Sequence, residues 1–308
     1  MPAPLFLSSG DLIADRRYDF ARDLQLRGDI AGAADLMAQA VERAPNFASA
    51  WFALGELKQQ LNLHGEAIRA YRKAQEADPE DRHGAKLRLI RLGVETVSDM
   101  PPAYVRSLFD QYAPTFEDAL LNNLGYRGPS LLLKAVLSAC RAMQRPAFFK
   151  SAIDLGCGTG LAARAFEKNV DAFVGIDLSP GMIAKAEATG LYRRLEIADM
   201  VEGLRNEADA SFDLALSADA IIYLPDLAPA LKEVARVLRP NGIVAFTTET
   251  HPGDGVVIGA GLRYAHGAAH VREAIAGAGL VLGSLEEAST RTESDVPVPG
   301  LIAVARKI

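Results

Sequence analysis

The sequence has few cysteines, no excess of positive charge and no long apolar run, and each absence excludes a class of protein. Cysteine occurs only at Cys140 and Cys157, so there is no disulfide framework and no CxxC or Cys/His metal spacing. No apolar run approaches the roughly 20 residues that span a bilayer, and the N-terminus lacks the pattern of a secretory signal. We therefore expect a soluble protein in a reducing, cytoplasmic compartment, without a membrane partner.

The charge balance gives no reason to expect a nucleic-acid partner. Lys and Arg number 33 against 39 Asp and Glu, for a net charge of -6, whereas polyphosphate binding normally needs a basic face. The chain has 308 residues, of which 49% are hydrophobic. This length accommodates two globular domains of roughly 150 residues each.

The first hundred residues contain an internal repeat. Ala33, Met37, Ala40 and Pro45 recur 34 residues later as Ala67, Tyr71, Ala74 and Pro79. The pattern resembles the tetratricopeptide repeat. The second copy fits well because Trp51, Leu54 and Gly55 precede it, while the first copy departs from it, with Arg17 and Ala21 in place of the Trp and Gly.

The repeat predicts paired helices in an all-α domain over residues 1–100. We expect them at residues 12–27, 31–44, 48–61 and 65–77, with a fifth near 82–93 and a linker around 94–101. Two interpretations of this domain remain open. In the first, the domain holds a partner protein in its concave face. In the second, it only braces the domain that follows.

A helical preamble is expected over residues 101–150. Phe109, Tyr112 and Phe116 fall at i, i+3 and i+7, on one helix face, and Pro114 should break the helix. A second helix is expected at 128–142. An apolar stripe of this kind ordinarily faces a core.

From residue 151 onward, strand-like and helical stretches alternate. Strands are expected at 151–155, 172–177, 194–198, 212–217 and 242–249, and helices near 160–168, 180–188 and 226–238. This alternation predicts an α/β fold with a doubly wound, mostly parallel sheet. The runs "LVLGSLEEAST" and "GLIAVARKI" have no helix between them, so the sheet should end in an antiparallel hairpin.

The stretch "IDLGCGTG" places Gly156, Gly158 and Gly160 directly after the first of these strands. Ligands of such folds bind at the carboxyl ends of the strands, where a bare turn and a helix N-terminus accept a carboxylate or phosphate. The spacing is GxGxG and not the GxGxxG of dinucleotide folds, which disfavours an NAD oxidoreductase. Asp177 ends the second strand and suits both ribose hydroxyls, which fits NAD and S-adenosylmethionine equally.

Four motifs in order carry a more specific resemblance: "IDLGCGTG", "GIDLSPGMI", "IADM" and "LRPNGIVAFTTE". Together they resemble class I S-adenosylmethionine-dependent methyltransferases over residues 101–308, which implies a seven-stranded sheet. With the repeats in front, the chain resembles a group of predicted methyltransferases that carry tetratricopeptide repeats. Asn241 stands where the family commonly has Gly, and Asn tolerates the same left-handed turn.

The resemblance implies a binding site for S-adenosylmethionine. Asp154 and the three glycines of the turn would surround the methionine part of the cofactor, and Asp177 would hold the ribose. The adenine would lie among Leu178, Met182, Asp199 and Met200, and the sulfonium beside Ser217, Ala218 and Tyr112. Met182 and Met200 are equally well explained as core residues, and Cys157 as a small filler inside the turn.

Candidates for the chemistry follow the fourth and fifth strands. Methyl transfer needs an aligned acceptor, and a base only where the acceptor must lose a proton. Asp219 and Tyr223 follow strand four, and Arg263, Tyr264, His266 and His270 follow strand five. We take Asp219, His266 and Tyr264 as the catalytic candidates. The two histidines are expected at i and i+4 on one face of a short helix, as a base or an acceptor contact without a metal.

These observations favour a methyltransferase with a small-molecule acceptor. Two alternatives remain open. A protein methyltransferase would recruit its substrate through the repeats, and a catalytically silent adaptor would bind the cofactor without turnover.

Overall fold

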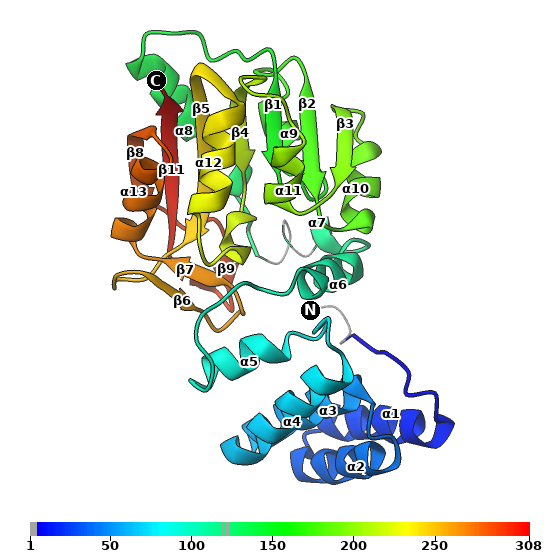
Figure 1. Cartoon of the computed structure of the whole chain (residues 1–308). Helices are drawn as coiled ribbons and strands as arrows, with labels where there is room; N and C mark the ends of the chain where they lie inside the picture. The colour runs from blue at the N-terminus through cyan, green and yellow to red at the C-terminus, as the bar shows by residue number, and fades with distance from the viewer. Residues whose placement is uncertain (1–4, 119, 121–123) are drawn as a thin grey trace. The chain divides into compact units, whose positions relative to one another are not determined.

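A computed structural model of the chain describes residues 5–118, 120 and 124–308. The chain forms two compact units, which divide between Leu108 and Phe109 (Figure 1). The division falls inside helix α6 (Pro102–Tyr112), after the linker that the sequence predicts at 94–101. No helix in the described part of the chain is both long and apolar enough to cross a membrane.

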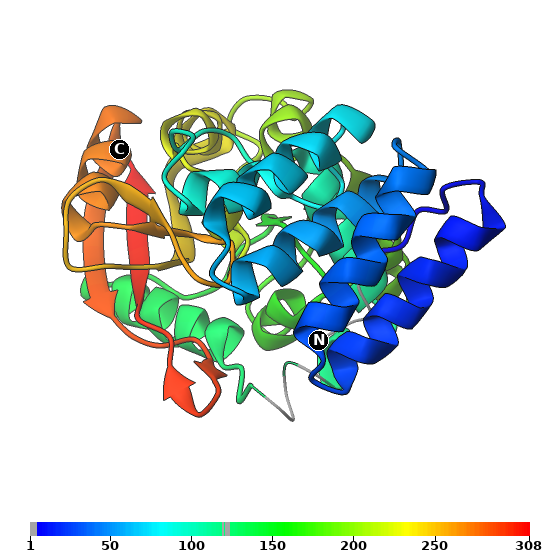
Figure 2. The same ribbon diagram turned by 90° about the horizontal axis from the view of Figure 1, so that it is seen from below.

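The first unit consists of helices at the places that the repeat predicts. They are α1 (Leu12–Leu26), α2 (Ile30–Arg43), α3 (Ala48–Gln60), α4 (His64–Ala77) and the shorter α5 (Ala85–Arg91). Neighbours along the chain pack together, α1 on α2 and α3 on α4 (Figure 2). The prediction of paired helices from the 34-residue period is therefore confirmed.

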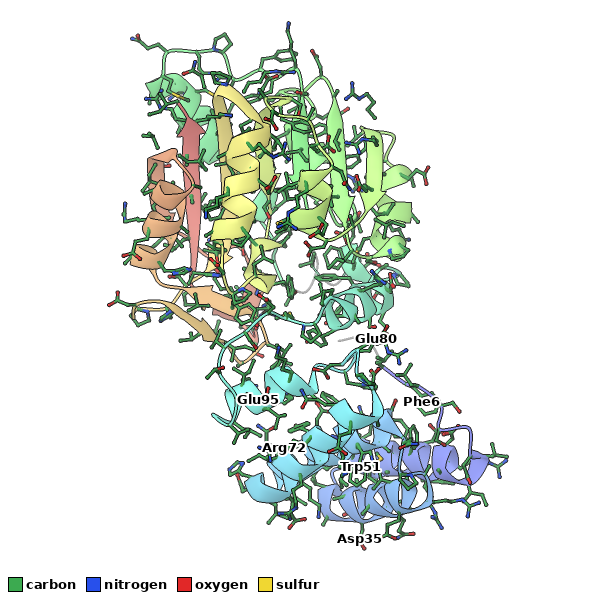
Figure 3. All side chains as sticks on the ribbon, viewed as in Figure 1. Phe6, Asp35, Trp51, Arg72, Glu80 and Glu95 are labelled. Atoms are coloured by element: carbon green, nitrogen blue, oxygen red, sulfur yellow. The ribbon has the colours of Figure 1, made fainter. Side chains whose placement is uncertain are left out.

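Small residues set the close packing of this helical unit. Ala33 and Ala67 are fully buried, and Gly55 of α3 faces the ring of Tyr71 on α4. The Tyr71 hydroxyl lies 3.0 Å from Oε1 of Gln59, which fixes the ring. Trp51, labelled in Figure 3, donates its indole N–H to the carbonyl of Pro45 at 2.7 Å.

The preamble of the second unit is helical, with the expected break. Helix α6 ends at Tyr112, a turn carries Pro114, and the short α7 (Phe116–Asp118) follows. Helix α8 (Gly128–Ala142) coincides with the prediction at 128–142.

The core of the second unit is a doubly wound sheet, as predicted. Its main strand order is β3-β2-β1-β4-β5-β11-β8. The bounds are β1 (Ala152–Leu155), β2 (Phe173–Asp177), β3 (Tyr192–Ile197), β4 (Phe212–Ser217), β5 (Leu238–Glu249), β8 (Leu280–Glu287) and β11 (Gly300–Lys307). Strand β11 runs antiparallel to both β5 and β8, which confirms the terminal hairpin.

Helices cover both faces of this sheet. On one face, α8 and α9 (Leu161–Phe166) share an apolar core with the strands, and on the other face α11 (Met200–Arg205), α12 (Ala228–Val237) and α13 (Ala268–Gly277) share a second. Helix α10 (Pro180–Glu187) packs on β2 and β3. Strands β1 and β2 are buried along their whole length, as the central strands of a parallel sheet must be.

Several short elements are not predicted by the sequence analysis. They are α11, the 3₁₀ turn η2 (Ile221–Tyr223), and the strands β6 (Val256–Ile258), β7 (Tyr264–His266), β9 (Thr292–Glu293) and β10 (Val296–Pro297). Two- and three-residue strands are too short to show a period of two. Strand β3 also begins two residues before its predicted start, at Tyr192.

The contact between Gly55 and Tyr71 yields a stability prediction. A Cβ at Gly55 would lie 2.5 Å from the Tyr71 ring, so Gly55→Ala should destabilise the helical unit by about 1–3 kcal/mol through overpacking. Urea unfolding followed by the fluorescence of Trp51, the single tryptophan, measures the loss. Gly65→Ala is the matched control, because nothing lies within 4 Å of its Cβ. Equal stability of the two variants would contradict the packing argument.

Candidate functional site

The turn between β1 and α9 has a backbone path that favours glycine at three positions. Gly156, Gly158 and Gly160 have φ values of 66°, 54° and 88°, in the left-handed region that other residues rarely adopt. A Cβ at Gly156 would lie 2.2 Å from the Cβ of Ala220. The loop that follows β4 therefore approaches the turn so closely that a side chain has no room.

Asp177 ties the end of β2 to this turn. One carboxylate oxygen accepts from the Gly158 N–H at 2.8 Å and the other from the Ser179 N–H at 2.9 Å. The side chain is largely buried, and burial raises the pKa of its carboxyl group above the usual range. Asp177 thus lies at the carboxyl end of the sheet beside the turn, where the sequence predicts it.

Asp154 lies buried in β1 below the same turn and has one oxygen without a partner. The Tyr192 hydroxyl donates to Oδ2 at 2.7 Å, while the buried Oδ1 has no hydrogen-bond partner. Burial raises the pKa of this carboxyl group to about 7. A buried, unsatisfied acceptor is costly in a protein interior, so its geometry suits a ligand that brings a donor or a positive charge.

The remaining predicted cofactor residues occupy the ends of the neighbouring strands. Asp199 caps α11, since Oδ1 accepts from the N–H groups of Val201 at 2.9 Å and Glu202 at 3.3 Å. Its Oδ2 makes neither of these bonds. Ser217 donates to the Leu155 carbonyl at 3.1 Å. Leu178 and Ala218 are partly exposed, Met200 is buried and Met182 is fully buried.

The preamble is fastened to this end of the sheet by two acids that sequence analysis missed. Asp110 accepts from the Ser179 hydroxyl at 2.5 Å and from the Gly181 N–H at 3.1 Å, at the N-terminus of α10. Glu117 makes two bonds with the Arg164 guanidinium, at 2.8 and 3.0 Å. Both acids belong to the stretch "FDQYAPTFED". The sequence analysis used only the spacing of its aromatic residues, which does not indicate a role for the acids.

Aromatic side chains of the preamble lie over the glycine turn. Phe116 is the nearest side chain to a Cβ built on Gly158, at 3.8 Å. Phe109 packs edge-on against Phe116 and against Tyr223, with ring centroids 6.0 and 5.4 Å apart. Tyr112 is partly buried, and burial raises the pKa of its phenol. The aromatic stripe therefore spans the turn and the loop after β4.

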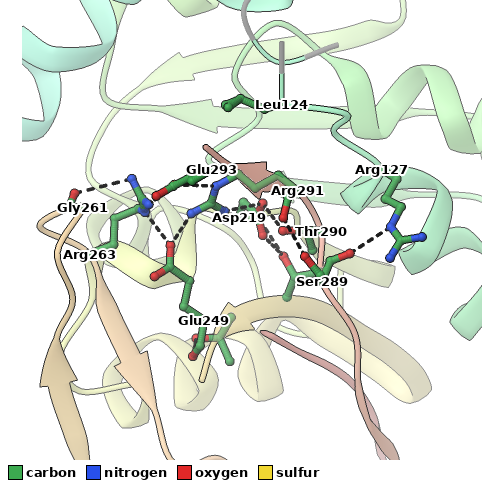
Figure 4. A network of polar contacts seen from close by, with 12 residues as sticks. Leu124, Arg127, Asp219, Glu249, Gly261, Arg263, Ser289, Thr290, Arg291 and Glu293 are labelled. Atoms are coloured by element: carbon green, nitrogen blue, oxygen red, sulfur yellow. Dashed lines mark hydrogen bonds and ion pairs between the residues drawn. The ribbon is translucent and has the colours of Figure 1, made fainter. Parts of the chain in front are cut away.

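A charged network lies at the carboxyl ends of β4 and β5 (Figure 4). The side chain of Arg291 is only 6% exposed and contacts three acids: Asp219 at 3.1 Å, Glu293 at 3.2 Å, and Glu249. Arg263 contacts Glu249 and Glu293 as well. Three carboxyl groups thus share two guanidinium groups within this network.

The segment with Arg291 also holds the preamble. The Thr290 hydroxyl donates to Asp219 at 2.7 Å, while its carbonyl accepts from the Arg127 N–H at 2.8 Å (Figure 4). Arg127 donates to the Ser289 carbonyl at 2.9 Å, and the Thr292 N–H donates to the Leu124 carbonyl at 2.9 Å. Sequence analysis treated this segment only as the connection of the final hairpin.

The prediction that the two histidines lie on one helix is wrong. His266 ends strand β7, whereas His270 lies in α13, which begins at Ala268. Gly267 lies between the two elements, and its extended backbone caps the helix. The two imidazole rings nevertheless stack, with centroids 5.7 Å apart. The i, i+4 rule does not hold across a segment that changes from strand to helix.

The surroundings of His266 fit a structural role. Its Nε2 donates to the Leu224 carbonyl at 2.9 Å, and its Nδ1 lies 2.7 Å from the Thr248 hydroxyl. Burial lowers the pKa of the imidazole to about 4, so the ring is neutral at neutral pH. Tyr264, on the same strand, is also fully buried. Of the three catalytic candidates, only Asp219 belongs to the charged network.

The chain is similar to two known protein families and to several methyltransferases. The family described as "Methyltransferase domain" matches residues 153–246, and "Tetratricopeptide repeat" matches residues 48–81. Human methyltransferase-like protein 27 is 31% identical over 172 residues, which cover 54% of this chain and 67% of that protein.

Two further similarities concern a shorter stretch and the fold. Malonyl-[acyl-carrier protein] O-methyltransferase of Salmonella typhimurium is 38% identical over 100 residues, or 32% of this chain and 39% of that protein. The match therefore spans well under two thirds of this relative's length. The 1,6-didemethyltoxoflavin-N1-methyltransferase of Burkholderia thailandensis, solved with S-adenosylhomocysteine and 1,6-didemethyltoxoflavin, has a TM-score of 0.51 at 18% identity, over 70% of this chain and 93% of that one. This likeness shows a shared fold.

The burial of His266 predicts a pH-dependent stability. The unfolded imidazole has a pKa near 6.5 and the folded one about 4, so the unfolded state binds more protons between these values. The contribution of His266 is therefore present above about pH 6.5 and is lost as the pH falls toward 4, by about 3 kcal/mol. Urea unfolding of the wild type and His266→Gln at several pH values measures the difference. Parallel pH profiles for the two proteins would contradict the assignment.

Proposed function

The chain belongs to the S-adenosylmethionine-dependent methyltransferases, and we propose that it methylates a small-molecule acceptor at the carboxyl ends of β4 and β5. The cofactor of this family is S-adenosylmethionine. The observation that carries the proposal is the unpaired, buried oxygen of Asp154 beneath a turn of three positive-φ glycines, with Asp177 at its side. That combination fits an amino-acid group and a ribose bound next to each other.

We assign the cofactor contacts residue by residue. Asp154 and the turn at Gly156–Gly160 would hold the methionine part, and Asp177 the ribose, since each of its oxygens retains acceptor capacity. Asp199 would accept from the adenine amino group, with its cap to α11 fixing the carboxylate. Leu178 and Met200 would border the adenine. When bound, the cofactor supplies an electrophilic methyl group on a sulfonium.

The preamble would exclude water from the site. Phe109 and Phe116 lie over the turn and beside Tyr223, and Asp110 and Glu117 fasten their segment to α10 and α9. Removing water strengthens electrostatic interactions and favours the reaction of a sulfonium. Tyr112 would shield the methyl donor from the same side.

The acceptor would lie against the charged network. Asp219 is held by Thr247, Thr290 and Arg291, so its carboxylate is fixed in position and would orient an acceptor donor group. His266 and Tyr264 would support this wall from β7, as their complete burial favours. A site covered by the preamble and by residues 289–293 suits a compact acceptor, which is the argument for a small molecule.

One observation favours a second candidate. The tetratricopeptide repeat at residues 48–81 belongs to a class of modules that hold peptides, so a protein acceptor recruited through the helical unit is the alternative. It requires an extended side chain of that protein to reach Asp219 beneath the preamble.

Cofactor binding tests the assignment of the site. Asp177→Ala removes the acceptor for the ribose and for the Gly158 N–H, so affinity for S-adenosylhomocysteine should fall at least about tenfold. Isothermal titration calorimetry measures it. Asp171→Ala is the matched control, since this exposed acid precedes the same strand at its other end. Wild-type protein without affinity for S-adenosylmethionine or S-adenosylhomocysteine would refute the proposed function.

Labelling separates the two acceptor classes. The full chain is incubated with methyl-labelled S-adenosylmethionine and with either the small-molecule or the protein fraction of a cell extract. We expect label to accumulate in the small-molecule fraction and to be lost with Asp177→Ala. Label transferred to protein alone would favour the second candidate instead.

A further inference from the structure

Three strands of the sheet cooperate to hold one carboxylate. Asp154 of β1 lies opposite Gly175 of β2 in the parallel register, and Gly175 in turn lies beside Leu195 of β3. Tyr192, at the start of β3, pairs with Phe173 of β2. Tyr192 and Asp154 therefore stand on strands that do not touch each other, with β2 between them.

Gly175 makes the connection across β2 sterically feasible. A Cβ at this position would lie 2.8 Å from the Tyr192 ring, closer than a real side chain allows, and 3.0 Å from the Sγ of Cys157, a tight contact. The phenol can therefore pass over the bare backbone of β2 and reach Oδ2 of Asp154, at 2.7 Å. The same ring lies 3.2 Å from a Cβ built on Gly160, so it also supports the glycine turn from below.

The hydrogen bond from Tyr192 engages one oxygen of Asp154 and leaves the other available for a ligand. Oδ2 is occupied by the phenol, while Oδ1 is buried and unpaired. The whole residue is only 1% exposed, so water does not solvate this oxygen. No ion pair joins Asp154 to a cationic side chain among the described residues. The local charge is thus uncompensated until a cation arrives.

We propose that Tyr192 is a positioning residue that orients Asp154, so that its free oxygen receives the ammonium group of the cofactor's methionine part. The proposal rests on the proposed function, because it assumes that the turn binds this cofactor. Tyr192 itself touches neither the methyl group nor the acceptor. It acts through Asp154.

The charged and titratable neighbours of Asp154 give this arrangement a pH dependence. Asp177 on β2 and Tyr192 on β3 face it, and its charge also acts on Cys157 in the turn and Tyr126 before α8. Burial and Asp177 raise the pKa of Asp154 to about 7, against the Tyr192 hydrogen bond, which lowers it. An ammonium ion binds the ionised form, so cofactor affinity should decline as the pH falls below about 7.

The variant Tyr192→Phe removes the donor and keeps the ring. Without the phenol, the charged form of Asp154 loses a hydrogen bond and its pKa rises further. Affinity for S-adenosylhomocysteine should then fall about tenfold at pH 7, and its pH profile should move up by about one pH unit. Calorimetry between about pH 6 and pH 8 measures both effects.

Two controls isolate the positioning role. 5′-Methylthioadenosine lacks the amino-acid group, so Tyr192→Phe should leave its affinity within about twofold of the wild type at each pH. Tyr71→Phe removes another hydrogen-bonded phenol hydroxyl, in the helical unit, and should change neither affinity.

The outcomes separate the inference from the proposed function. A selective loss of S-adenosylhomocysteine affinity with a shifted pH profile supports the role of Tyr192. Equal weakening of both ligands means that the phenol only maintains the turn, and an unchanged pH profile means that it does not act through Asp154; either result overturns the inference. Wild-type protein that binds neither ligand would refute the proposed function itself.

Discussion

The second unit depends on one close approach, between the turn that follows β1 and the loop that follows β4. Gly156 leaves no room for a side chain beside Ala220, and the Gly158 N–H points at Asp177. The ends of β1, β2 and β4 are thereby drawn together around one turn. A parallel sheet exposes unpaired backbone groups at this edge, and a turn without side chains leaves them open to a ligand.

Two further layers build on that turn. The preamble contributes aromatic rings that cover it and two acids, Asp110 and Glu117, that fasten those rings to α10 and α9. The segment around Arg291 closes the other side by joining Asp219 and Glu249 to the backbone near Arg127. The preamble is polar where it is anchored and aromatic where it faces the turn, which suits a site that must exclude water.

Sequence analysis succeeded where a feature is local. The 34-residue period places the paired helices because each repeat buries the same small residues, and Pro114 ends α6 because it lacks a backbone N–H. The positions of the glycine turn and of Asp177 follow from strands whose apolar runs are continuous. The prediction that His266 and His270 lie on one helix was wrong. His266 ends a three-residue strand, and such a short strand has no periodicity that distinguishes it from a helix.

The sequence by itself determined the order of helices and strands, the bare turn and the family, because these depend on residues close together along the chain. The tertiary structure decided which polar groups meet. Tyr192 and Asp154 are 38 residues apart and Arg291 and Asp219 are 72 residues apart, and no local pattern encodes either contact. Both arise only once the sheet has brought distant strand ends to one edge, where burial makes every unpaired carboxylate oxygen require a partner.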